Sequence, residues 1–335
     1  MNDHYIGIDI GKASLEVYIP RGSVSCSFDN TRQGIRQLYG KLKKIYRKEF
    51  SDLIFIFEHT GSYSHLLASV CSEKETKAYI VRPSMSANFA KAVGNRNKTD
   101  KADAHMLYRM YATLSERPAK VPSIDQTAVS FRSMMGYYKH LQKERVRAQN
   151  YLDSVKCKNV EGPIAGRLEK KVRQLRKEEE EILALLREFI QKEPEYAEHV
   201  RNFQTVKGIG EVASLALLNI FLTYPETSKG ELTALMGLDP VVRESGTSVR
   251  KKSRISKQGN RLYRSLLFMP AMMACNYNDE MKAFYQRLKE NGKHTTQAQL
   301  AVMRKLILLA HALYKNKCPY DPEKHRKKHA VKEIV

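Results

Sequence analysis

The sequence lacks the features of the common membrane and secreted classes. Its longest apolar runs, such as 215–222, fall far short of the ~20 residues that a membrane-spanning helix requires. Its first twenty residues include Asp3, Asp9 and Glu16, unlike a secretory signal peptide. Its five cysteines are scattered and form no C-x-x-C pair, so they indicate neither a disulfide framework nor a zinc site. We therefore expect a soluble protein of a reducing, cytoplasmic compartment with no membrane partner.

Acidic residues are scarce relative to basic ones. The 335 residues include 36 Asp and Glu against 58 Lys and Arg, a formal net charge of +22. Such an excess destabilises a compact state by self-repulsion unless a polyanion neutralises it, which predicts a nucleic-acid partner. At roughly 150 residues per domain, the length predicts about two domains with sizeable cores.

The first 118 residues alternate between predicted strands and helices. Short β-rich runs at 5–10, 15–19 and 24–28 predict an antiparallel meander. Further along, the periodicity predicts a helix at 34–47, a strand at 53–57, a helix at 64–70, a strand at 78–81 and a helix at 100–114. The order βββαβαβα is typical of an RNase H-like domain, a mixed sheet flanked by helices.

The rest of the chain is predicted to be mainly helical. Residues 119–200 predict a long charged arm, with an interrupted heptad-like apolar stripe and a break at Gly162 and Pro163. This arm could pack on its own domain or dimerise as a coiled coil. Residues 201–320 predict a helical, glycine-punctuated C-terminal domain, and 321–335 form a basic tail.

Four carboxylates stand out by their placement. Asp9 ends the first strand and Glu58 the central one, and strand ends are where such sheets carry their sites. Asp100 and Asp103 are three residues apart and extend the core-facing stripe of the helix that follows them. Taken singly, each has an ordinary interpretation as a turn residue, a cap or a first-turn carboxylate.

Together these carboxylates predict a metal site. Two carboxylates ~4 Å apart repel by on the order of 4 kcal/mol at an effective dielectric of 20, which a bound cation would relieve. Mg²⁺ suits oxygen ligands and can stabilise charge that develops on a phosphodiester, and Mn²⁺ is a possible substitute.

A second constellation is strongly basic. Between residues 243 and 264 the only acid is Glu244, and the segment should lie against phosphates. Its basic residues are Arg243, Arg250, Lys251, Lys252, Arg254, Lys257, Arg261 and Arg264. Within it, the hydroxyl of Ser245 could either hydrogen-bond a phosphate or attack it.

A glycine-containing turn precedes the basic segment. Lys207, Gly208 and Gly210 lie in a pattern typical of a helix-hairpin-helix turn, whose backbone N–H groups can bind a phosphate. A plain glycine turn between packed helices would give the same pattern.

Taken in order, these motifs resemble the DEDD insertion-sequence transposases, also called bridge recombinases, from residue 5 to about 320. The motifs that carry the resemblance are Tyr5-Ile6-Gly7-Ile8-Asp9, Glu58-His59-Thr60-Gly61, Asn97 to Ala104, Gly208-Ile209-Gly210, Glu244 to Arg250, and Ser256 to Arg264. One local departure is Lys251-Lys252, where small residues are common in relatives.

The resemblance implies a RuvC-like N-terminal domain, a helical arm and a C-terminal transposase domain. It implies that Asp9, Glu58, Asp100 and Asp103 are the DEDD metal ligands, and that Ser245 is the nucleophile that joins covalently to DNA. It also implies strand exchange between donor and target DNA through a Holliday-junction-like intermediate, guided by a structured non-coding bridge RNA.

Two further expectations follow from a recombinase, and two other functions stay open. A recombinase that holds two DNA molecules should be a homo-oligomer, a dimer or tetramer, near the bacterial nucleoid. A RuvC-like nuclease would use the same carboxylates to hydrolyse junctions, with no covalent intermediate. A non-catalytic nucleic-acid-binding protein would need only the basic surface.

Overall fold

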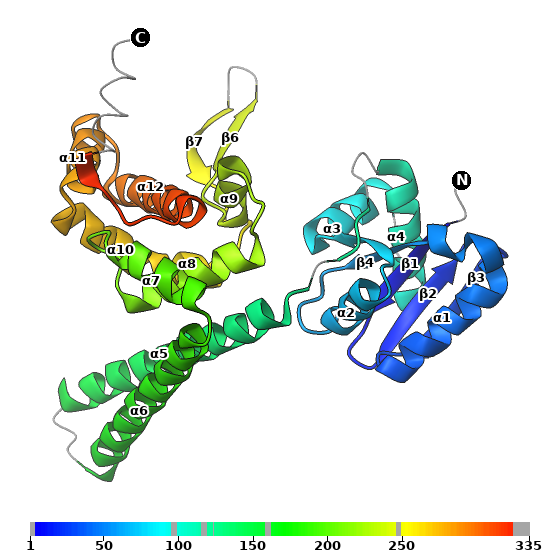
Figure 1. The fold of residues 1–335 in the computed structure, drawn as a ribbon, viewed down its shortest axis with the longest axis horizontal. Helices are drawn as coiled ribbons and strands as arrows, with labels where there is room; N and C mark the ends of the chain where they lie inside the picture. Colours follow the sequence, from blue (N-terminus) through cyan, green and yellow to red (C-terminus); the bar gives the residue numbers. More distant parts are fainter. Residues whose placement is uncertain are drawn as a thin grey trace. The chain divides into compact units, whose positions relative to one another are not determined.

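The computed structural model describes residues 4–94, 99–114, 119–122, 124–157, 162–245 and 249–323. The chain separates into two compact units, 1–124 and 125–335, and each is described by itself (Figure 1). The first unit contains β1 (Tyr5–Ile10), β2 (Ser14–Ile19), β3 (Val24–Asp29), α1 (Arg32–Tyr46), a 3₁₀ turn (Arg47–Asp52), β4 (Ile54–Glu58), α2 (His65–Glu73), β5 (Lys77–Val81), α3 (Pro83–Ala92) and α4 (Asp100–Leu114). The second contains α5 (Gln126–Cys157), α6 (Pro163–Gln191), α7 (Pro194–Gln204), α8 (Glu211–Thr223), α9 (Lys229–Leu235), β6 (Pro240–Ser245), β7 (Val249–Ile255), α10 (Arg261–Tyr277), α11 (Asp279–Glu290) and α12 (Thr295–Asn316).

The first unit is built on a five-stranded mixed sheet of order β3-β2-β1-β4-β5. The first three strands form the predicted antiparallel meander, and β4 and β5 join it in parallel. The predicted mixed α/β sheet is therefore confirmed. The parallel pairing of β1 with β4 brings their carboxyl ends to one edge of the sheet.

The two faces of the sheet carry different helices because residues alternate along each strand. In β1, Ile6, Ile8 and Ile10 pack into the core shared with α1 and α2. On the other face, Gly7 lies directly beneath α4: a Cβ at this glycine would come within 2.0 Å of the Ala104 carbonyl oxygen. Glycine at this position thus lets the α4 backbone touch the sheet.

One helix of this unit was not predicted. The sequence pattern predicted a strand at 78–81 and no helix directly after it, but Pro83 is the first residue of α3. Proline is favoured at this position because its fixed φ suits the helix and its missing N–H has no intrahelical partner there.

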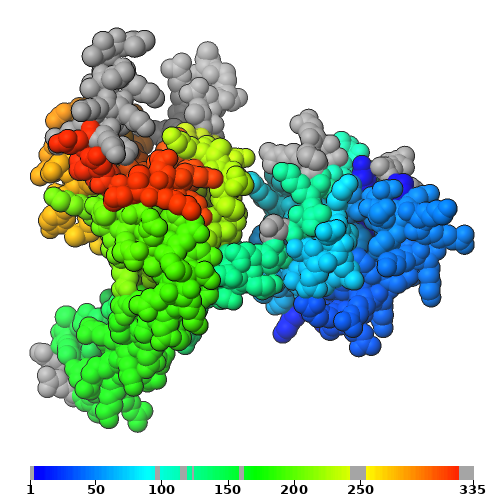
Figure 2. Space-filling model, in the orientation of Figure 1, coloured from blue at the N-terminus to red at the C-terminus, as the bar shows by residue number. Residues whose placement is uncertain are grey.

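The second unit combines a helical hairpin with a helical core. α5 and α6 pack along each other, and Pro163 begins α6 after the break (Figures 1 and 2). The base of this hairpin belongs to the same core as the later helices, since Phe131 of α5 and Leu186 of α6 are fully buried in it. Its outer part has a smaller apolar contact and an ion pair, Arg145 to Glu179 at 2.7 Å. The arm therefore packs on its own unit, and coiled-coil dimerisation stays a prediction.

The basic segment is a β-structure within a domain that was predicted to be mainly helical. It forms an antiparallel hairpin, β6–β7, with a register shift between Val241 and Arg243. β-Branched residues such as Val249 and Ile255 favour this structure. The predicted basic tail lies outside the described residues from 324 onward, and no helix in the described ranges is both long and apolar enough to cross a membrane.

Candidate active site

Asp9 and Glu58 lie side by side at the carboxyl ends of adjacent parallel strands. Ile8 pairs with Phe57 in the β1–β4 register, so the next residues, Asp9 and Glu58, stand at the same level. Each of them directly follows a residue of the α1–α2 core. Because successive side chains of a strand point to opposite faces, Asp9 and Glu58 face the side of the sheet that α4 covers. The pairing of β1 with β4 thus brings two of the four predicted carboxylates together.

α4 brings the other two to the same edge. Thr99 caps this helix: its hydroxyl accepts from the Ala102 N–H at 3.3 Å, and its carbonyl accepts from the Asp103 N–H at 2.9 Å. Ala104 lies over Gly7 and Tyr111 packs against Tyr5, so α4 runs back along β1 and its first turn, with Asp103, lies toward Asp9. Asp100, one turn earlier, is exposed.

The other three carboxylates lie close enough to Asp9 to influence its ionisation. Burial is the first cause that raises the pKa of Asp9, from 3.8 to about 6. Three negative charges raise it further, in the order Asp103, Asp100 and Glu58. Within the described ranges, no lysine or arginine forms an ion pair with Asp9, Glu58 or Asp100. The negative charges of these three carboxylates are therefore not neutralised by any ion pair in the described part of the chain.

The four carboxylates do not converge on one point. Among the described residues, no group of three or more His, Cys, Asp or Glu side chains is close enough together to hold a metal ion as it stands. The donor set itself consists only of carboxylate oxygens, which suit a hard divalent cation.

Two residues near this edge were missed by the sequence analysis. Glu16 pairs directly with Asp9 across β1 and β2, and its Oε2 atom is buried with no hydrogen-bond partner among the described residues. The alternation of polar residues along β2 was the signal for it. Asn30 donates to the Gly11 carbonyl at 3.0 Å and to the Tyr63 carbonyl at 3.1 Å. It thereby ties the turn after β1 to the loop after β4.

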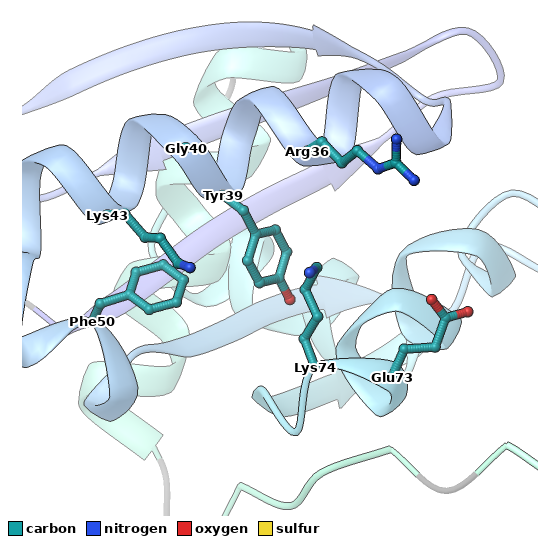
Figure 3. Close-up of a pocket in the computed structure, with 7 residues that line it drawn as sticks. All are labelled: Arg36, Tyr39, Gly40, Lys43, Phe50, Glu73 and Lys74. Carbon is teal, nitrogen blue, oxygen red and sulfur yellow. The ribbon is translucent and has the colours of Figure 1, made fainter.

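A separate cavity of about 550 Å³ lies on the opposite, α1–α2 side of the sheet (Figure 3). It is lined by Arg36, Tyr39, Gly40, Lys43, Phe50, Glu73 and Lys74. Its one acid, Glu73, pairs with Arg32 at 2.9 Å. This cavity shares no residue with the carboxylate edge.

The predicted nucleophile lies on the hairpin of the second unit. Ser245 is the last residue of β6, and its backbone pairs with Val249. The side chains of residues 242–245 and 249–253 and all of 246–248 lie outside the described part of the chain. This covers the side chains of four predicted phosphate contacts, Arg243, Arg250, Lys251 and Lys252.

The remaining predicted contacts fall into two groups. Arg254, Lys257 and Arg261 line one large groove, which is described below. Arg264 instead holds the backbone together, because it donates to the carbonyls of Met236 at 2.9 Å, Gly259 at 2.8 Å and Lys257 at 3.3 Å. The structure thus gives Arg264 a positioning role.

The glycine turn is built for helix packing. Gly208 has a φ of +105°, and a Cβ there would come within 2.9 Å of Ala274. Gly210 precedes α8, and the first helical residue, Glu211, pairs with Arg187 at 2.9 Å. The first turn of α8 therefore carries an ion-paired carboxylate. Phosphate binding by Lys207, Gly208 and Gly210 stays a prediction.

Comparison with known proteins identifies the family. Residues 6–155 match the DEDD transposase family model of IS110 type, described as a transposase, and residues 200–286 match one described as transposase IS116/IS110/IS902 family. The chain belongs to the DEDD transposase family of insertion sequences. This transposase is 29% identical over 338 residues to a pilin gene-inverting protein of Moraxella lacunata, covering 97% of this chain and 100% of the relative. It is 28% identical over 341 residues, with the same coverage, to the pilin gene-inverting protein of Moraxella bovis.

A more distant relative comes from an insertion element. An uncharacterized 43.6 kDa protein of insertion element IS110 from Streptomyces coelicolor is 25% identical over 118 residues, which is 35% of this chain and 29% of the relative. The transposase is therefore a DNA transposase or recombinase enzyme, and its N-terminal domain is RuvC-like, as the sequence predicted. DEDD transposases typically depend on a divalent metal ion.

Proposed function

We propose that Asp9, Glu58, Asp100 and Asp103 hold a divalent cation, Mg²⁺ or Mn²⁺, against a DNA phosphate. The observation that carries this proposal is the parallel β1–β4 register, which sets Asp9 and Glu58 side by side at the sheet edge that α4 covers. The raised pKa of Asp9, whose causes include the other three carboxylates, supports it. Negative charges gathered at one sheet edge favour cation binding, and oxygen donors suit these two ions. When bound, the cation would stabilise the negative charge that develops on the phosphate oxygens.

Ser245 is the nucleophile of this proposed reaction. Its Oγ forms a bond to the phosphorus of the scissile phosphodiester while the bond from phosphorus to the 3′ oxygen breaks, and the serine proton is transferred to that departing oxygen. The products are a 5′-phosphoserine and a free 3′-hydroxyl. Because the phosphodiester energy is retained, a 3′-hydroxyl of another strand can reverse the step and complete strand exchange without an external energy source.

The partners follow from this reaction. Donor and target DNA are the substrates, and a homo-oligomer, a dimer or tetramer, supplies the several active centres that strand exchange requires. We include a structured bridge RNA as the guide on the strength of the family resemblance and of the +22 net charge, which suits more than one polyanion. Placement in the bacterial cytoplasm at the nucleoid belongs to the same proposal.

Ser245→Ala tests the nucleophile. The variant should form no covalent DNA adduct yet bind nucleic acid nearly as well as the wild type. One lost hydrogen bond costs about 1 kcal/mol, which is small beside the binding free energy that the basic residues gain by neutralising phosphates. Denaturing gels with end-labelled element-end DNA, guide RNA and Mg²⁺ would reveal the adduct. Ser253→Ala is the matched control, since it removes a hydroxyl from the same basic hairpin.

The outcomes separate the competing functions. An adduct that survives in Ser245→Ala would eliminate this nucleophile. Metal-dependent cleavage with no adduct in the wild type would identify a RuvC-like nuclease that hydrolyses DNA, and binding without any cleavage would leave only a nucleic-acid-binding protein.

A further inference from the structure

A large groove lies within the second unit at the base of the β6–β7 hairpin. Its volume is about 1090 Å³, and its walls come from α10, α12 and the hairpin. Arg261, Ser265 and Phe268 line it from one face of α10, at helical spacing. Gln297, Leu300 and Arg304 line it from one face of α12 in the same way. Two facing helices and a hairpin thus form a continuous trough.

The charged side chains of the groove are basic. Arg254, Lys257, Arg261 and Arg304 line it together with the structural Arg264, and no acidic residue among those that the structure describes lines it. None of the first four forms an ion pair within the part of the chain that the structure describes. Like charges gathered without counter-charges repel, and a polyanion in the groove would relieve that repulsion.

The backbone that carries Lys257 and Arg261 is held in place before any ligand arrives. Lys257 has a φ of +55°, and its N–H donates to the Gly237 carbonyl at 3.1 Å. The turn that carries it is seated against α9, because a Cβ at Gly259 would come within 2.1 Å of the Leu235 carbonyl oxygen. Asn260 then caps α10, accepting from the Leu262 N–H at 2.9 Å. Such rigidity lowers the ordering cost of binding.

The groove also offers an apolar surface. Phe268, Leu300 and Ala301 are half-buried and line it between the cations. A cationic track beside an aromatic ring that lines the same groove is the combination that holds single-stranded nucleic acid, with phosphates on the cations and a base on the ring.

We propose that this groove binds single-stranded DNA, with its phosphates on Arg254, Lys257, Arg261 and Arg304 and an unstacked base against Phe268. This inference rests on the proposed function, because it commits to the DNA strand on which Ser245 acts. Pro240 lines the groove at the start of β6, and five residues at 3.3 Å each place Ser245 roughly 16 Å further along the hairpin. The groove would therefore hold the part of the DNA strand that leads to Ser245 on the hairpin.

Binding of short fluorescein-labelled oligothymidylate to the full-length protein tests the groove. We expect Arg261→Ala and Arg304→Ala each to weaken binding several-fold at low salt, and each to reduce the slope of log affinity against log salt by about 0.7. Arg201→Ala, an exposed arginine of α7 outside the groove, is the matched control and should bind like the wild type. Both groove arginines are exposed, so folding should be retained.

Phe268→Leu tests the stacked base separately. It keeps an apolar side chain, so the core should hold, but it removes the ring. We expect on the order of a tenfold loss for oligothymidylate and no loss for an abasic oligonucleotide of equal length. Equal losses for both probes would overturn the stacked base, and tighter binding of oligouridylate than of oligothymidylate would overturn the assignment to DNA.

The adduct assay distinguishes failure of this inference from failure of the proposed function. If the wild type forms the Ser245 adduct while both groove arginine variants bind and cleave normally, the groove assignment is wrong and the proposed function stands. If groove variants lose oligothymidylate binding while the wild type forms no adduct, the groove assignment stands and the nucleophile is wrong.

Discussion

Replacing Asp9 with asparagine should stabilise the metal-free protein. The amide is close in shape to the carboxyl group and neutral, so it removes one negative charge from the site. The ionised Asp9 is disfavoured in the folded state, because burial and the neighbouring carboxylates raise its pKa to about 6. A variant that cannot ionise should escape this cost.

The pKa of Asp9 sets the size of the effect. A rise from 3.8 to about 6 corresponds to roughly 3 kcal/mol against the ionised form. Asp9 is only partly buried, so solvent screening reduces this to about 1.5 kcal/mol. For a unit of this size, that gain raises the melting temperature by about 6 °C.

The direction of the Asp9 pKa shift predicts how the stability of the protein depends on pH. Because the folded-state pKa lies above the unfolded one, the folded state binds more protons between about pH 4 and pH 6, and the wild type loses stability as pH rises through this window. The gain from Asp9→Asn should therefore be near zero below pH ~4 and complete above pH ~6. If the proposed metal site is right, added Mg²⁺ should stabilise the wild type more than the variant, because an ion that binds only the folded state stabilises it.

Thermal melts of the N-terminal unit's transition in chelator, at pH 4 and pH 8, measure this difference. Asp52→Asn, at an exposed acid of the same unit, is the control and should leave the melting temperature unchanged. A lower melting temperature for Asp9→Asn in chelator at pH 8 would refute the reasoning, because it would mean that the carboxylate makes a stabilising contact inside the protein.

The other predictions concern packing and assembly. Gly7→Ala should lower the free energy of unfolding by about 2 kcal/mol or more, because its Cβ would come within 2.0 Å of the Ala104 carbonyl oxygen. Gly40→Ala, whose Cβ would have nothing within 4 Å, should not destabilise the protein. Urea titrations of both variants check this. Mixing Asp103→Asn with Ser245→Ala should restore some cleavage if one subunit's serine completes another subunit's carboxylate site. Absence of cleavage after verified subunit exchange would exclude a shared site.

Local patterns in the sequence were sufficient to predict most of the strands and helices of the first unit. The three early strands, β4, β5 and the start of α4 at Asp100 were all predicted within one or two residues. Each depends on periodicity and turn residues close in the chain, and such signals do not require knowledge of distant contacts. The α3 helix was missed because a proline can end one element and begin the next.

The proximity of the four carboxylates could not be predicted from local patterns alone. Their positions at strand ends and at a helix start were readable from the sequence, but their proximity depends on the β1–β4 register and on the close approach of α4 at Gly7. Glu16 joined this edge only through its pairing with Asp9 in the antiparallel meander.

The sequence by itself determined the charge, the mixed sheet followed by helices, and which acidic and basic residues could carry chemistry, because those properties are local or additive. Tertiary structure alone decided that Arg264 binds backbone carbonyls, that the basic segment is a hairpin, and that Arg304 and Phe268 of separate helices line one groove. These are relations between residues far apart in the chain, and only packing brings such residues together.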